Sequence, residues 1–416
     1  MFLGPRGDGK SSETGILRAW PPAGPPLVWQ REVGEGYAGP VVSAGRLFLF
    51  DREGENARLT CLSSETGEEL WQAEYASVYE DYYDYSRGPR ASPTVDGDRV
   101  YTFGVEGRLR CHRVADGELL WDVDTAGRFG VVQNFFGVGA APVVEGDLLL
   151  VVVGGSPPDS PSIQSGEVVG DGSGVVAFDK RTGEVRYAVS DELAGYSSPT
   201  LATIDGRRWA FVFARGGLLG FDPTNGEVDF HFPWRSKVLE SVNAANPVVV
   251  GDRVLISECY GPGSALLAVR PGGYDVVWID QGRDRVLQSH WATPIHHDGW
   301  IYGTDGRHSG SAELRAFNLA TREIGWSQPD LGRTTHLWVD DHLIVLGEYG
   351  KLSLIESTPE AFRLVAESEL AIPHAGENDP DGGLLRYPAW TPPVLSHGLL
   401  YLRGKDRLVA LELIPG

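Results

Sequence analysis

Side chains with acid–base, hydrogen-bonding and aromatic chemistry recur along this chain, one set just before each of eight similar modules. They are Tyr37, Arg90, Asn134, Tyr196, Asn243, His290 with Trp291, His336, and Tyr387 with Trp390. Imidazole and phenol groups can transfer protons. Aromatic rings beside hydrogen-bonding groups around a concavity can bind a planar or sugar-like ligand. These residues can act together only if the fold brings eight distant parts of the chain to one place.

The modules themselves indicate such a fold. Most begin with a small residue, a proline and an apolar residue. The prolines Pro40, Pro93, Pro142, Pro199, Pro247 and Pro294 lie 53, 49, 57, 48 and 47 residues apart, and Pro392 follows after twice that interval. Thr335–Val339 stands where the missing opening is expected. A period near 50 residues, with four short apolar runs in each unit, is typical of a β-propeller.

The second module shows how one blade is built. Ala91–Val95 predicts an inner strand, and Asp96–Asp98 a tight turn. Strands are then predicted over 99–103 and 108–114, and a fourth after the turn at Asp116-Gly117. Short strands joined by Gly and Asp turns predict a four-stranded antiparallel blade.

The two ends of the chain complete one another. The last module ends after its third strand at Leu413, and an unpaired strand-like segment at 27–30 precedes the first module. Pairing these two segments would close the ring and remove both exposed sheet edges. We therefore predict an all-β fold, a single eight-bladed propeller over 27–416 closed by its N-terminal strand, with residues 1–26 as a leader packed on the ring.

The module ends carry a recognisable motif. AFDKRTGEVRY at 177–187 and AFNLATREIGW at 316–326 follow the pattern Ala-x-Asp-x-x-Thr-Gly-x-x-x-Trp most closely. This pattern resembles the tryptophan-docking motif of the quinoprotein (PQQ-type) propellers, and the chain looks like the bacterial PQQ-like β-propeller repeat proteins. It has a more distant resemblance to the outer-membrane assembly scaffold propellers and the quinoprotein alcohol dehydrogenases. The resemblance covers about residues 27–413 and implies that the closing tryptophans pack between blades. We expect this role for Trp71, Trp121, Trp278 and Trp326.

Propeller topology predicts which face carries function. The Asp-Gly and Thr-Gly turns should lie on one face, and the longer loops between and within blades on the other. Long loops on a rigid scaffold are common functional sites. The ten recurring residues should ring the mouth of the central channel on this long-loop face, joined by Arg215, Glu258, Asp305, His308, Glu348, Arg403 and Lys405. The alternative is that these side chains plug the channel. Because unperturbed histidines titrate near neutral pH, any binding involving His290 and His336 is expected to depend on pH between about 5 and 8.

The other features of the sequence give weaker evidence about function. The formal net charge of −21 argues against nucleic-acid binding. Cys61, Cys111 and Cys259 have no metal-binding or disulfide spacing. His296-His297 and the acidic loop at 378–383 are weak metal candidates, so no metal site is predicted. The tyrosines between 75 and 85 could form an interface or pack over the ring.

Three functions remain open. A non-catalytic scaffold propeller that binds a protein partner or a small or carbohydrate ligand is preferred, because no catalytic motif is present. The resemblance also implies a PQQ-dependent, alcohol dehydrogenase-like oxidoreductase with calcium, although the adjacent cysteines of that group are missing here. A carbohydrate-active hydrolase or lyase at the channel mouth is the third. We expect no cofactor, no membrane span and a monomer. Because there is no signal-peptide pattern, a cytoplasmic protein is expected, or a periplasmic or secreted one if a leader has been removed.

Overall fold

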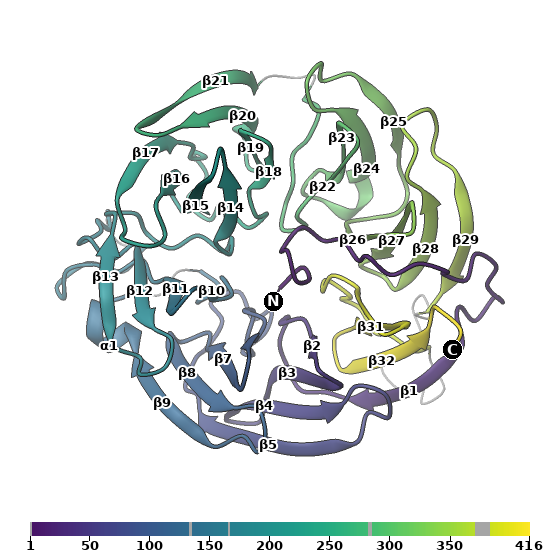
Figure 1. Ribbon diagram of the computed structural model, residues 1–416, viewed down its shortest axis with the longest axis horizontal. Coiled ribbons are helices and arrows are strands. Elements are labelled where there is room, and N and C mark those ends of the chain that lie inside the picture. Colours follow the sequence, from purple (N-terminus) through teal and green to yellow (C-terminus); the bar gives the residue numbers. More distant parts are fainter. Residues whose placement is uncertain (1, 133–134, 165–166, 282–284, 371–382) are drawn as a thin grey trace.

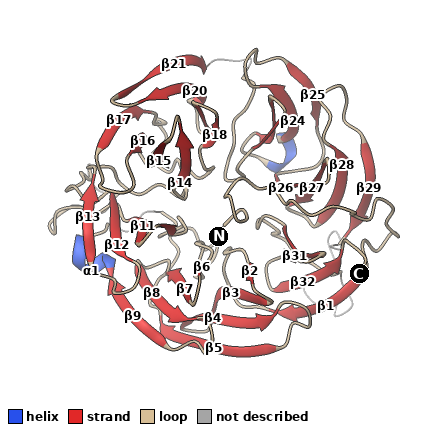
Figure 2. Cartoon of the chain, in the orientation of Figure 1, coloured by secondary structure: helices blue, strands red, loops and turns tan. Residues whose placement is uncertain are grey.

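The computed structural model describes residues 2–132, 135–164, 167–281, 285–370 and 383–416. These residues form eight antiparallel sheets of four strands, arranged as blades around a central channel (Figures 1 and 2). The predicted eight-bladed propeller is thus confirmed. The only helices among the described residues are α1 (Thr125–Phe129) and a short 3-10 turn (Ser309–Ser311), and neither is long and apolar enough to cross a membrane.

Each blade runs outward from a short inner strand. Blade 1 contains β2 (Val41–Ser43), β3 (Arg46–Glu53), β4 (Asn56–Ser63) and β5 (Glu69–Ala76); blade 2 contains β6 (Thr94–Asp96), β7 (Arg99–Phe103), β8 (Arg108–Arg113) and β9 (Leu119–Asp124). Blade 3 contains β10 (Val143–Glu145), β11 (Leu148–Val152), β12 (Val175–Asp179) and β13 (Val185–Val189); blade 4 contains β14 (Thr200–Ile204), β15 (Arg207–Phe213), β16 (Gly217–Phe221) and β17 (Val228–Pro233).

The second half repeats this order until the last blade. Blade 5 contains β18 (Val248–Val250), β19 (Arg253–Glu258), β20 (Gly263–Arg270) and β21 (Gly273–Asp280); blade 6 contains β22 (Ile295–His297), β23 (Trp300–Asp305), β24 (Glu313–Asn318) and β25 (Ile324–Gln328). Blade 7 contains β26 (Thr334–Val339), β27 (His342–Gly347), β28 (Lys351–Glu356) and β29 (Leu364–Glu369); blade 8 contains β30 (Val394–Ser396), β31 (Leu399–Arg403), β32 (Arg407–Glu412) and β1 (Leu27–Glu32).

The N-terminal strand closes the ring as predicted. β1 pairs antiparallel with β32, with Trp29 opposite Ala410 and Arg31 opposite Leu408. This pairing gives blade 8 its fourth strand from the opposite end of the chain (Figure 1). Both sheet edges that would otherwise be exposed are therefore satisfied.

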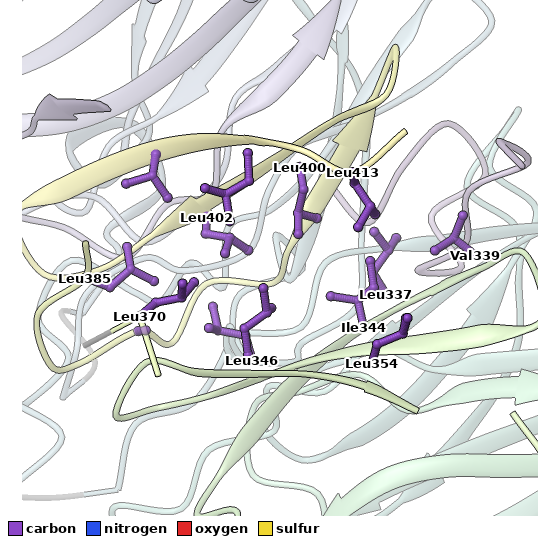
Figure 3. Packing of buried hydrophobic residues seen from close by; sticks show 14 of the residues in the cluster. Leu337, Val339, Ile344, Leu346, Leu354, Leu370, Leu385, Leu400, Leu402 and Leu413 are labelled. Carbon is purple, nitrogen blue, oxygen red and sulfur yellow. The ribbon is translucent and has the colours of Figure 1, made fainter. Parts of the chain in front are cut away.

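Apolar side chains fill the spaces between neighbouring blades. Between blades 7 and 8, Leu337, Ile344 and Leu354 face Leu400, Leu402 and Leu413, and all are buried (Figure 3). The core is therefore divided among the inter-blade spaces of the ring, which leaves the channel to polar and aromatic side chains at its ends.

The closing tryptophans pack between blades and donate a hydrogen bond across each interface. The indole nitrogens of Trp71, Trp121, Trp278 and Trp326 donate to the carbonyls of Val114, Lys180, Leu319 and Thr358 in the following blades, at 3.0, 3.2, 2.9 and 2.8 Å. A Cβ added to Gly117 would lie only 2.6 Å from the Trp71 ring. The glycine of each Thr-Gly-type turn thus receives the ring of the blade before it.

The leader crosses the short-turn face. It starts at the centre of the ring, passes over blade 7 and reaches the rim at β1 (Figure 1). Lys10 pairs with Trp338 through a parallel bridge, and the Ser11 nitrogen donates to the Trp338 carbonyl at 2.8 Å. Ile16 is buried among the leucines of blades 7 and 8. The leader therefore covers the face opposite the long loops.

Candidate functional site

Aromatic side chains from the long loops meet over the mouth of the channel. The Trp390 ring, just before β30, lies 4.9 Å from the Tyr37 ring and 5.2 Å from the Trp291 ring, between centroids. The Trp291 indole nitrogen donates to the Trp390 carbonyl at 3.1 Å. Trp291 precedes blade 6 and Trp390 precedes blade 8, so this contact joins the loops of two blades that are not neighbours in the ring. The sequence-predicted residues Tyr37, Trp291 and Trp390 are thus brought together.

A buried ion pair supports this aromatic group. Arg333 lies 4.8 Å from the Trp291 ring and 5.2 Å from the Trp390 ring. Its guanidinium binds Glu348 at 2.5 Å, and the Trp390 indole nitrogen donates to the same carboxylate at 3.1 Å. Burial alone would raise the pKa of Glu348, but the hydrogen bonds from Arg333 and Ser309 outweigh it and hold that pKa below its usual range. The charges of Arg333 and Glu348 are therefore paired with one another.

The opposite side of the mouth is held by Arg90. Its guanidinium forms an ion pair with Asp81 and lies over the rings of Tyr37 and Tyr79, at 5.9 and 5.7 Å. The Tyr196 hydroxyl accepts a hydrogen bond from the Phe136 nitrogen at 3.0 Å. Burial raises the pKa of Tyr196 far above its usual range, so its hydroxyl stays protonated.

Five exposed tyrosines form the outer layer of the site. We call Tyr82, Tyr83, Tyr85, Tyr349 and Tyr387 the tyrosine platform. Tyr349 and Tyr387 are stacked with centroids 4.9 Å apart, and Tyr85 and Tyr387 lie 6.3 and 6.1 Å from Trp390. The platform is thus in contact with Trp390.

The two predicted histidines are not solvent-exposed groups at the mouth. Burial and the charge of Arg333 lower the pKa of His290 to about 3, and its Nε2 lies 2.9 Å from the Tyr260 hydroxyl. His336 lies within β26 rather than before it, and is buried with its Nε2 2.7 Å from the Thr334 hydroxyl. Burial lowers the pKa of His336 to about 4. The expected titration of these histidines between pH 5 and 8 is therefore wrong.

Other predicted residues hold loops in place. Asn243 is buried and donates to the carbonyls of Ala214 and Arg215 at 2.7 and 3.3 Å. Arg403 is also buried and donates to the carbonyls of Ala38 and Gly34. Asn134 lies outside the described residues. Asn243 thus fixes its own loop to the residues that follow β15, and Arg403, at the end of β31, fixes the loop before β2. Both roles are structural.

The structure adds no support for the remaining candidate metal sites. The His297 ring packs 4.6 Å from the Trp338 ring on the leader side of the molecule, and the acidic loop at 378–383 lies mostly outside the described residues. Across the described part of the chain, no group of three or more histidines, cysteines and acids could hold a metal ion.

Sequence reasoning missed Arg333 and Tyr349. Neither lies at the recurring position just before a predicted inner strand. Arg333 directly precedes β26, which starts at Thr334, one residue before the expected start at Thr335. Tyr349 lies in the loop after β27. The one signal for Tyr349 in the sequence is that it directly follows Glu348, which was predicted to join the mouth.

Solved structures show the same architecture. The chain is similar to BamB from Moraxella catarrhalis, with a TM-score of 0.59 at 14% identity, over 93% of this chain and 97% of that one. It is also similar to the quinohemoprotein alcohol dehydrogenase from Comamonas testosteroni, with a TM-score of 0.63 at 11% identity, over 99% of this chain and 79% of that one. At these identities the likeness concerns the fold alone. A comparison with curated proteins finds no match.

The described residues do not fit a quinone held by calcium at the mouth. A planar cofactor would need the space where Trp390 packs against Tyr37 and Trp291. The buried acid at that place, Glu348, already binds Arg333, Ser309 and Trp390. Binding a quinone there would require these contacts to break.

The sequence itself decides the family. The family described as outer membrane protein assembly factor BamB matches residues 13–151 and 55–328, which together make up more than half of the chain. The repeat period, the docked tryptophans and the eight blades agree with this match. The chain belongs to this family of PQQ-like β-propellers.

Proposed function

We propose that this chain is a non-catalytic binding propeller that docks a protein partner on the tyrosine platform. The exposed aromatic surface around packed aromatic side chains is the observation that carries this proposal. Tyr82 and Tyr85 are 62% and 58% exposed, and three more tyrosines surround the same mouth. Tyrosine, tryptophan and arginine are enriched at protein interfaces and among their energetically dominant residues.

The support beneath the platform favours binding. Trp390 contacts Tyr85, Tyr387 and Tyr37, and the Arg333–Glu348 pair lies under Trp390. A surface held in this way loses little conformational entropy when a partner binds, which improves affinity. The contacts of Trp390 with Tyr37 and Trp291 support a surface for binding rather than an open substrate pocket.

The candidate acid and base groups of a hydrolase or lyase are poorly suited to catalysis, which supports a binding role. The pKa values of His290 and His336, about 3 and 4, make both imidazoles very weak bases. Arg90 is engaged with Asp81, and Tyr196 with the Phe136 backbone. General acid–base catalysis works best when the pKa of the group lies near the working pH.

The test is site-specific photocrosslinking in cells that make the protein. A photoreactive phenylalanine at Tyr85 should give a discrete protein adduct, and the same group at Asp98, on the short-turn face, should not. The adduct should be lost when Tyr349 and Tyr387 are both replaced by serine, which leaves the buried layer intact. Equal adducts from both faces, or an adduct unaffected by the serine variants, would contradict the proposal. Binding of the purified protein to a glycan array, lost in the same variants, would instead assign the platform to a carbohydrate.

A further inference from the structure

A second concavity lies under the long loops of blades 2, 3 and 4, beside Tyr79, whose ring also contacts Arg90. Its volume is about 210 Å³. Its walls are mainly aliphatic, and include Val105, Val131, Val153, Ile163 and Val168. An apolar cavity of about 150 Å³ is enough to bind benzene. This space can therefore hold a small ring or a short alkyl chain.

The loops around the cavity are fixed by local contacts. Asp124 caps α1 by accepting a hydrogen bond from the Gly127 nitrogen at 2.9 Å, and Gly130 ends the helix with a left-handed backbone. Gly137 and Gly154 also have positive φ, and a Cβ at either would lie within 2.5 Å of a neighbouring loop. The cavity therefore results from a defined loop geometry that these glycines permit.

One buried polar group in the cavity wall has no partner. The Tyr79 ring lines the cavity and is 3% exposed. Its hydroxyl makes no hydrogen bond to any described residue. An unsatisfied buried hydroxyl costs free energy, and native structures usually pair such groups. The Tyr79 backbone is held in place, because Arg52 donates to its carbonyl at 2.7 Å.

A guanidinium shares this wall. Arg215 lines the same cavity, is 7% exposed and donates to the Leu239 carbonyl at 3.0 Å. Burial and the neighbouring positive charge of Arg235 lower the pKa of Arg215 to about 10. Arg215 and Tyr79 thus line the same cavity. The Glu106 carboxylate also lines the cavity, but it accepts hydrogen bonds from the Tyr75 and Ser77 hydroxyls. A further negative charge beside Arg215 would offset its repulsion by Arg235.

We propose that this cavity binds a small apolar carboxylate, with its hydrocarbon part among the valines and its carboxylate accepting hydrogen bonds from Tyr79 and Arg215. A hydroxyl and a guanidinium are both donors, so the ligand must supply acceptor atoms. A carboxylate supplies two, and its hydrogen bonds to ionised donors are the strong ones. None of the five platform tyrosines lines this cavity.

Phenylacetate is the probe, because it combines one ring with one carboxylate and fits the volume. It should raise the melting temperature of the full chain and give a saturable calorimetric isotherm. 2-Phenylethanol, which keeps the ring without the charge, should bind about tenfold more weakly, and 2-phenylethylamine should not bind. Equal binding of the acid and the alcohol, or no saturable binding of phenylacetate at about 10 mM, would overturn the proposal.

Variants then locate the site. Tyr79→Phe removes only the unpartnered hydroxyl, so the fold should be retained while phenylacetate binding weakens about tenfold. Ala126→Phe places a ring in the cavity wall and should abolish binding. Tyr401→Phe, which alters a buried phenol in blade 8, is the matched control and should bind phenylacetate normally. Unchanged binding in both cavity variants would show that phenylacetate binds elsewhere, which also overturns the proposal.

Discussion

The indole nitrogen of Trp29 donates a hydrogen bond to the carbonyl of Ser64 at 3.0 Å, and so joins the first strand of the chain to blade 1. Trp29 belongs to blade 8 through the pairing of β1 with β32. Its ring lies against Gly67, where an added Cβ would be 2.7 Å away. The closure of the ring therefore uses the same tryptophan-on-glycine contact that joins other neighbouring blades.

Replacing Trp29 by alanine should lower the free energy of unfolding by about 3–5 kcal/mol, because it removes a buried ring at the closure. Val28 lies in the same strand but is 46% exposed. Val28→Ala is therefore the control, and should change stability by less than about 0.5 kcal/mol. Denaturant unfolding measures both. Similar losses in the two variants would mean that strand pairing, rather than the docked ring, closes the propeller.

The steric role of a glycine beside a docked tryptophan can be tested separately from the effect of its left-handed backbone. Gly117 and Gly97 both have positive φ, 77° and 57°, but only Gly117 faces a tryptophan, whereas Gly97 has open space around its Cα. Gly97→Ala should cost about 1–2 kcal/mol from the left-handed backbone alone. Gly117→Ala should cost about 1–3 kcal/mol more, because the methyl group displaces the Trp71 ring. Thermal unfolding of the two variants measures both losses of stability. Equal losses in Gly97→Ala and Gly117→Ala would contradict a steric role for Gly117.

The blades were predictable because each repeats the same local rules. Pro93 and Pro142 open modules, glycine turns separate strands, and Trp71 and Trp121 close them at a fixed distance. The unpaired segment at Trp29 identified the closing strand for the same reason. The site is different, because it depends on contacts between loops. Trp291 and Trp390 meet only because the ring brings together residues 99 positions apart. His336 was placed at the mouth, yet β26 begins two residues before it, and Asn243 was placed there although it binds backbone carbonyls.

His290 and His336 should remain neutral over the range in which histidine ordinarily titrates. The pKa values of His290 and His336, about 3 and 4, are below the usual 6.5. The unfolded chain therefore binds more protons below pH 6.5, and stability should fall as the solution becomes more acidic. NMR of the two imidazoles should show no protonation between pH 8 and 5. The same nuclei in the denatured chain, which should titrate there, are the control. Protonation of either folded imidazole near pH 6.5 would restore the sequence-based expectation.

Glu258 should make the chain less stable as the pH rises towards neutrality. It is buried at the end of β19, where one carboxylate oxygen accepts from the Tyr260 nitrogen at 2.8 Å and the other has no partner among the described residues. Burial raises its pKa from 4.5 to about 7, although the Tyr260 and Gly263 backbone and Arg285 act in the opposite direction. Between these two values the folded state binds more protons than the unfolded state. The stabilisation is then complete below about pH 4.5 and is lost as the pH rises through about 7.

Glu258→Gln should remove this loss, because the amide keeps the size of the side chain and cannot ionise. The free energy of unfolding of the variant, relative to the wild type, should therefore increase between pH 4.5 and 8, by up to about 3 kcal/mol. Burial also raises the pKa of Asp305 to about 6. Its effect on the free energy of unfolding is the same in the variant and the wild type, so it does not contribute to the difference between them. Glu356→Gln, at an exposed ion pair with Arg363, is the control and should follow the wild-type profile. Denaturant unfolding across this pH range gives the three curves. Parallel curves for Glu258→Gln and the wild type would mean that the Glu258 carboxyl group is ionised in the folded chain at little cost.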